Sequence, residues 1–208
     1  MISPSHRFIY LHAPKTGGNS IQTLLQPLSD DRIVLRGHQD GHDRFEIQGS
    51  VTPRKHACLS DYVDALGNAI DEYKIIISVR HPFHRAISFY FSPHRWIRKS
   101  EGAEGWKLEN AFWTLDAFEK CLESMVPMVD FLKIDGAPVW PDHVIRFENI
   151  AEDFERCATA LGISSRLAKL PHVNRSVAEH MARDALNDAE AERLVKTRFA
   201  ADYRFFSY

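Results

Sequence analysis

The chain has 208 residues, of which 44% are hydrophobic and 26% are charged. This composition is typical of a globular protein and excludes a disordered chain, and the length suits a single domain, which we expect to span residues 1–208. Because 26 lysines and arginines nearly balance 28 acidic residues, the net charge of −2 provides no global field for a nucleic acid partner, and any anion site must be local.

Cysteine usage and hydropathy indicate the compartment. The cysteines Cys58, Cys121 and Cys157 are odd in number and form no CxxC pair, so neither a disulfide framework nor a zinc site is indicated. No signal peptide is visible, and the longest apolar runs, such as residues 75–79, are far shorter than the roughly 20 residues of a membrane-spanning helix. We therefore expect a cytoplasmic protein with reduced thiols and no integral membrane segment.

Apolar runs alternate with segments of helical periodicity along the chain. The expected strands are residues 8–11 (FIYL), 75–79 (IIISV) and 143–147 (HVIRF). The expected helices are residues 20–25, 59–70, 82–91, 114–125 and 150–161. This alternation predicts the α/β fold class, with a central mostly parallel sheet flanked by helices.

Two further segments do not follow the alternation. Residues 131–140 carry Asp135-Gly136 between partly apolar arms and are expected to form a small hairpin. Residues 28–58 are rich in Asp, His, Arg and Gly, and we expect a loop-rich excursion on the ligand side of the sheet.

The first motif, HAPKTGGNS, joins the first expected strand to the first expected helix. Glycines there permit a tight turn, and the free amides of the helix can bind an anion. A lysine adds a mobile charge, and the polar side chains can donate hydrogen bonds. The candidate binding residues are Lys15, Thr16, Gly17, Gly18, Asn19 and Ser20. The alternative is a plain strand-to-helix turn, and the kinase pattern GxxxxGK[ST] is not matched, because the lysine precedes the glycines.

The second motif, KIIISVRHPFHRAISFYF, repeats this arrangement. Arg80 ends the second expected strand, and Ser88 lies one to two turns into the following helix. Both are expected at the same end of the sheet as Lys15, where they could hold a second phosphate. Taken singly, an arginine after a strand is more often a surface or ion-pairing residue.

Together, PKTGGNS and VRHPFHRAISFY resemble the paired signatures of sulfotransferases that use 3′-phosphoadenosine 5′-phosphosulfate (PAPS). The similarity is to the carbohydrate branch with its heparan and chondroitin enzymes (sulfotransferase family 2), and the later segment LPHVNRS resembles bacterial members. It implies a P-loop-like three-layer sandwich. It also implies that the first loop holds the 5′-phosphosulfate, with Lys15 at the leaving oxygen, and that Arg80 and Ser88 hold the 3′-phosphate. In LPHVNRS, Asn174 or Arg175 is expected to approach the nucleotide, and no metal is expected.

An alcohol acceptor requires a base near neutral pH, and histidine suits that role. We assign it to His56, which precedes a short helix and the Arg80 strand, as the proposed catalytic histidine does in the similar heparan 2-O-sulfotransferases. His12, His38 and His42 are the competitors, and an ordinary loop histidine is the structural alternative for His56.

The expected acceptor is a hydroxyl of a glycan or glycolipid. A basic group consisting of Arg32, Arg36, Arg44, Arg54 and Lys55 could bind an anionic sugar, although solvated loop charge is the favoured explanation. The functional alternatives are a P-loop-type nucleotide kinase, which should show the GK[ST] order, and a non-catalytic nucleotide-binding module. The sequence leaves the oligomeric state open.

Overall fold

The structure, a computed structural model, describes residues 1–37, 44–92, 97–99, 106–108, 112–164 and 182–208. The chain forms two compact units. The first unit comprises Met1–Val34, Phe45–Arg80 and Met128–Val173, and the second comprises Leu35–Arg44, His81–Pro127 and Asn174–Tyr208. Each unit has a hydrophobic core of its own, and the assignment of the whole chain to one domain stays a prediction.

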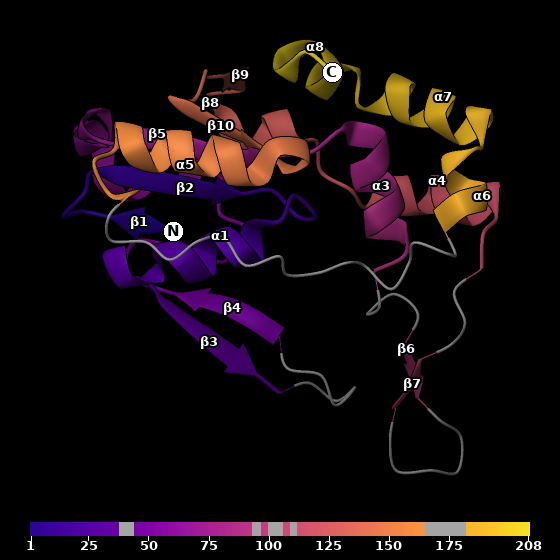
Figure 1. Ribbon diagram of the computed structural model, residues 1–208, viewed down its shortest axis with the longest axis horizontal. Coiled ribbons are helices and arrows are strands. Elements are labelled where there is room, and N and C mark those ends of the chain that lie inside the picture. The colour runs from indigo at the N-terminus through magenta and orange to yellow at the C-terminus, as the bar shows by residue number, and fades with distance from the viewer. Residues whose placement is uncertain (38–43, 93–96, 100–105, 109–111, 165–181) are drawn as a thin grey trace. The chain divides into compact units, whose positions relative to one another are not determined.

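A four-stranded sheet forms the centre of the first unit, in the order β1-β2-β5-β10 (Figure 1). The strands are β1 (Ile2–Ser3), β2 (Phe8–His12), β5 (Lys74–Val79) and β10 (His143–Arg146). β2, β5 and β10 are parallel, and β1 runs antiparallel to β2. The three parallel strands are those expected from the sequence. The two central ones, β2 and β5, are apolar at almost every position, because both faces of the sheet are covered there.

Three helices belong to this unit: α1 (Gly18–Leu25), α2 (Leu59–Leu66) and α5 (Ile150–Ala160). Tyr10 of β2 is paired with Ile76 of β5, so both lie on one face of the sheet, where they form a core with side chains of α1 and α5. Ile9 and Ile77 on the opposite face are also buried. The chain therefore has the predicted α/β class, a mostly parallel sheet flanked by helices.

Two further pairs of short strands lie outside this sheet. β8 (Lys133–Ile134) and β9 (Ala137–Pro138) form the predicted hairpin, with Asp135 and Gly136 in left-handed conformation at its turn. β3 (Arg32–Arg36) and β4 (Arg44–Gln48) form a second two-stranded sheet. The prediction of a loop-rich excursion over residues 28–58 was thus incomplete, because the alternating pattern of RFEIQ in β4 indicates a strand with one covered face.

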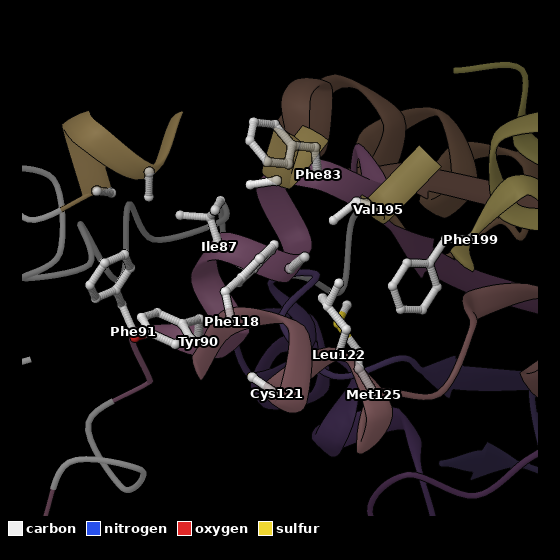
Figure 2. Close-up of a cluster of buried hydrophobic side chains, with 14 residues drawn as sticks. Phe83, Ile87, Tyr90, Phe91, Phe118, Cys121, Leu122, Met125, Val195 and Phe199 are labelled. Atoms are coloured by element: carbon white, nitrogen blue, oxygen red, sulfur yellow. The ribbon is translucent and has the colours of Figure 1, made fainter. Parts of the chain in front are cut away.

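The second unit is mainly helical. Its elements are α3 (Pro82–Tyr90), β6 (Ile97–Lys99), β7 (Trp106–Leu108), α4 (Leu115–Glu123), α6 (Ala182–Leu186), α7 (Ala189–Arg198) and α8 (Ala200–Phe206). Figure 2 shows its core, in which Phe83 and Ile87 of α3, Phe118 of α4 and Val195 of α7 take part. The aromatic residues Tyr90, Phe91 and Trp113 belong to this packing.

Local signals explain where several helices begin. Pro82 occupies the first turn of α3, and the Thr114 side chain caps α4 by accepting a hydrogen bond from the amide of Ala117. None of the described helices combines the length and the apolar character needed to cross a bilayer.

Candidate active site

The first motif forms the turn between β2 and α1. Lys15 and Gly17 have positive φ values of 71° and 81°, whereas Thr16 between them does not. Alternation of backbone handedness directs successive amides toward a common centre, which is a feature of anion-binding loops. α1 begins at Gly18 without a side-chain cap among the described residues and without an acidic residue in its first turn. Its positive end is therefore suited to an anion.

Crowding explains the two glycines. A Cβ atom at Gly17 would lie 2.8 Å from Cδ1 of Ile150, and its φ of 81° disfavours a side chain in any case. A Cβ atom at Gly18 would lie 2.1 Å from Cδ2 of His12. Both positions thus require glycine, for conformation and contact in the first case and for contact in the second.

The polar side chains of the loop differ in their surroundings. The hydroxyl of Thr16 is buried and donates to the carbonyl of Ala13 at 2.7 Å. Since that uses its single proton, the contact of 2.6 Å with Ser78 Oγ is a bond donated by Ser78, which in turn accepts from Tyr10. The Thr16 side chain therefore joins the loop to the sheet, which leaves its backbone for a ligand.

Asn19 and Ser20 are the remaining polar residues of the turn. Asn19 is exposed at the start of α1, whereas Ser20 is only 8% exposed. The exposed amide of Asn19 is thus open to a ligand from solvent.

Arg80 lies beside this loop. Its Nη1 donates to the carbonyl of Lys15 at 3.4 Å, and its guanidinium lies 4.1 Å from the centre of the Phe147 ring. Burial, and to a smaller extent the charge of Arg80, lowers the pKa of Lys15. Two cations are therefore held together at a partly buried position, which an anion would stabilise.

Lys55 adds a third cation. Its Nζ donates to the carbonyl of Phe45 at 2.7 Å and lies 4.6 Å from the centre of that ring. Burial lowers the pKa of Lys55 to about 8, Glu46 opposes the shift, and the charge of Lys15 adds to it. The pKa of Lys55 thus depends on the charge of Lys15, and its environment differs from that of Arg54, which pairs with Asp61 at the surface.

The His56 ring has a defined orientation. Its Nδ1 lies 2.8 Å from the carbonyl oxygen of His12, and the two ring centres are 4.5 Å apart. Because a carbonyl oxygen can only accept, Nδ1 carries the proton and the neutral ring has its lone pair on Nε2. This is the form that a general base requires.

His12, a competitor for this role, is only 4% exposed. Its Nδ1 is 2.9 Å from Oε1 of Gln22, and its pKa is held well below the ordinary value by burial and, to smaller extents, by the charges of His56 and Lys55. A buried histidine with this pKa is a poor proton acceptor. The other competitors, His38 and His42, lie outside the described residues.

A model of the Sulfotransferase family matches residues 1–208. The chain belongs to the sulfotransferase family. It is therefore a transferase that moves a sulfuryl group to a hydroxyl-bearing acceptor, as members of the family do with PAPS as their general donor. No curated protein and no solved structure gave a significant match.

The remaining predicted residues of the sulfotransferase stay predictions. Ser88 is half-buried on α3 in the second unit, and its joint action with Arg80 is untested. Asn174 and Arg175 lie outside the described residues. Among the residues that are described, no group of His, Cys, Asp or Glu side chains is suited to holding a metal ion.

Sequence reasoning missed two features of the sulfotransferase site. The sequence places Lys55 in a basic group that could bind an acceptor, with solvated loop charge as the favoured explanation, whereas its burial near Lys15 arises from tertiary contacts. Gln22 gave no signal, since a polar residue in an amphipathic helix usually faces solvent.

Proposed function

We propose that this sulfotransferase transfers the sulfuryl group of PAPS to a hydroxyl of a carbohydrate or glycolipid, with His56 as base and Lys15 at the leaving phosphate. The observation that carries the proposal is the meeting of two features at the β2–α1 turn. One is the partly buried cation group of Lys15, Arg80 and Lys55, and the other is His56 with its lone pair on Nε2.

The residues of the turn fit a phosphosulfate. A Cβ atom at Gly17 or Gly18 would overlap Ile150 or the His12 ring, so glycine at both positions permits this turn, and the start of α1 has no side-chain cap among the described residues. The backbone amides of Thr16 to Ser20, the ammonium of Lys15 and the side chain of Asn19 would hold its oxygens. Arg80 and Ser88 would hold the 3′-phosphate, with Asn174 near the nucleotide.

The chemistry follows from charge and proton movement. When bound, PAPS supplies an activated sulfuryl group. His56 Nε2 accepts the proton of the acceptor hydroxyl. As it does so, the hydroxyl oxygen forms a bond to sulfur, and the bond between sulfur and the phosphate oxygen breaks. Lys15 stabilises the negative charge that develops on that oxygen, and the helix terminus assists. Since these cations supply positive charge, we propose that no metal takes part.

The carbohydrate or glycolipid acceptor is the finer part of the proposal. It is supported by the similarity of the two motifs to the carbohydrate branch, and the choice of sugar and hydroxyl requires a screen. We would measure transfer of radiolabelled sulfate from PAPS to a panel of glycans and glycolipids.

Replacement of His56 by alanine tests the base. Because a general base contributes about 10²- to 10⁴-fold, His56→Ala should lower turnover by that factor while the affinity for 3′-phosphoadenosine 5′-phosphate (PAP) changes little. His6→Ala, which removes a histidine from an exposed turn, is the matched control. Normal turnover in His56→Ala would remove His56 from the mechanism.

A further inference from the structure

His12 lies between the donor loop and the proposed base. It is the last residue of β2, and its ring contacts the first residue of α1 so closely that Gly18 leaves no room for a Cβ atom. On the other side, its ring centre is 4.5 Å from that of His56, with the ring planes at 62°. The carbonyl of the same residue accepts the Nδ1 proton of His56. His12 thus contacts both parts of the site, although the mechanism above does not use its side chain.

Gln22 fixes the orientation of the His12 ring. It lies on α1, one turn after Gly18, and is fully buried. Its Oε1 is 2.9 Å from Nδ1 of His12. The neutral state of the buried ring leaves one ring proton, which Nδ1 donates to this oxygen.

The amide nitrogen of Gln22 comes at a cost to stability. Its Nε2 is buried and has no hydrogen-bond partner among the described residues. A buried unsatisfied donor costs about 1–3 kcal/mol, which roughly offsets the gain from the bond at Oε1. An apolar side chain of the same length would avoid this cost but would leave the buried Nδ1 proton of His12 without an acceptor, so the role of the amide at this position is to hold His12.

We propose that His12 and Gln22 are positioning residues, which hold the His12 carbonyl and ring so that His56 keeps its proton on Nδ1 and its lone pair on Nε2. The inference rests on the proposed role of His56 as base. The tautomer of a histidine is set by the hydrogen bond at its other nitrogen, so a displaced His12 carbonyl leaves His56 without a fixed tautomer or ring angle. The contact of the His12 ring with Gly18 links this position to the loop that holds the donor.

The test is nitrogen NMR of the full chain labelled on histidine, together with kinetics. In the wild type, His56 should show its neutral-state proton on Nδ1. In Gln22→Met, which keeps the side-chain length, the two tautomers of His56 should mix. A misplaced base should lower kcat by about 10- to 100-fold with the KM for PAPS within about threefold. Gln48→Met on exposed β4 is the matched control and should match the wild type.

His12→Phe is the second variant, since it keeps a ring over Gly18 but cannot donate to Gln22. Like Gln22→Met, it should mix the two tautomers of His56. The double variant His12→Phe with Gln22→Met should lower kcat no further than the more damaging single change, because both changes remove the same hydrogen bond. His6→Phe is its control. If His12→Phe does not fold, the wild-type and Gln22→Met spectra decide the question.

Two results would overturn the proposal. One is a wild-type His56 with its proton on Nε2, and the other is a Gln22→Met protein with unchanged tautomer and kcat. Failure of the proposed function has a different signature, because a fully active His56→Ala protein would deny the catalytic role of His56. The tautomer measurement would still decide whether His12 and Gln22 orient the ring.

Discussion

Gly17 and Gly18 follow one another in the donor loop but are required for different physical reasons. Gly17 has a left-handed φ and lies against Ile150, whereas Gly18 has an ordinary φ and lies against the His12 ring. The sequence predicted a tight turn with close backbone approach. It could not predict that the approaching group at Gly18 is the His12 ring, which lies next to the proposed base His56.

Substitution of Gly17 tests this reading of the loop. Gly17→Ala and Gly162→Ala both place a side chain at positive φ, but a Cβ atom at Gly162 meets no atom within 4 Å. Gly162→Ala should therefore show the backbone strain, about 1 kcal/mol of unfolding free energy, and normal PAP affinity. Gly17→Ala should lose more stability and bind PAP more weakly. Equal behaviour of the two variants in urea unfolding and calorimetric titration would contradict the crowding at Gly17.

Lys55 should make PAP binding depend on pH. The charges of Lys15 and Glu46 shift the pKa of Lys55, and the charge of Lys55 in turn lowers the pKa of His12. Because the pKa of Lys55 is about 8 in the free protein, its positive charge is lost as pH rises through 8, and PAP affinity should fall over that range. Lys55→Arg should remove this fall, since a guanidinium stays charged.

Lys55 should also make folding stability depend on pH, but in the opposite direction to PAP affinity. The folded pKa of Lys55, about 8, lies below its ordinary value of 10.5, so the unfolded chain binds more protons between these pH values. The contribution of Lys55 to the free energy of unfolding should therefore increase from pH 8 to pH 10.5. The difference in melting temperature between wild type and Lys55→Met measures it. A difference that does not change with pH, or PAP affinity that Lys55→Arg does not alter above pH 8, would contradict this account.

At the scale of elements, a buried ion pair joins two helices of the second unit. Arg85 on α3 is 1% exposed and Asp202 on α8 is 0% exposed, with Nη1 and Oδ2 3.9 Å apart. Arg85 also donates to the carbonyl of Val126 at 2.9 Å, and burial lowers its pKa to about 10. A buried charge whose partner is removed is costly, so this pair constrains how α3 and α8 pack.

Asp202→Asn should lower the free energy of unfolding by about 3 kcal/mol, because it leaves the Arg85 charge buried without its counterion. The exposed pair of Arg193 and Glu190 on α7 is the control, and Glu190→Gln should change stability by less than about 1 kcal/mol. Urea unfolding followed by circular dichroism measures both. If Asp202→Asn lowers the free energy of unfolding by no more than Glu190→Gln does, the buried pair does not stabilise the second unit.

At the scale of the whole molecule, the sequence predicted the elements with a strong local pattern. β2 and β5 are nearly continuous apolar runs, β10 follows the turn signal of Pro141-Asp142, and α3 and α4 have clear start signals at Pro82 and Thr114. β3 and β4 were missed because each is short and only partly covered. The helices of the C-terminal segment were not predicted as elements, because the burial of Val195 and Phe199 depends on α3 and α4, which are distant in sequence.

The candidate site was predictable to the same extent. The turn at Lys15 and the strand end at Arg80 follow from local motifs, whereas the choice of His56 rests on the resemblance to the heparan 2-O-sulfotransferases. The burial of His12, its bond to Gln22 and the lowered pKa of Lys55 arise from tertiary contacts, so no local pattern could indicate them. The functions assigned to these residues stay predictions.

The central claim is that the β2–α1 turn binds the sulfate donor. Isothermal titration of the full chain with PAP tests it most directly, with Lys15→Met as the variant and Lys133→Met, which removes a partly exposed lysine paired with Asp130, as the control. The account predicts binding by the wild type and by Lys133→Met, and affinity about 10- to 100-fold weaker in Lys15→Met because a charge-assisted contact is lost. Absence of PAP binding in the wild type, or equal affinity in Lys15→Met, would contradict it.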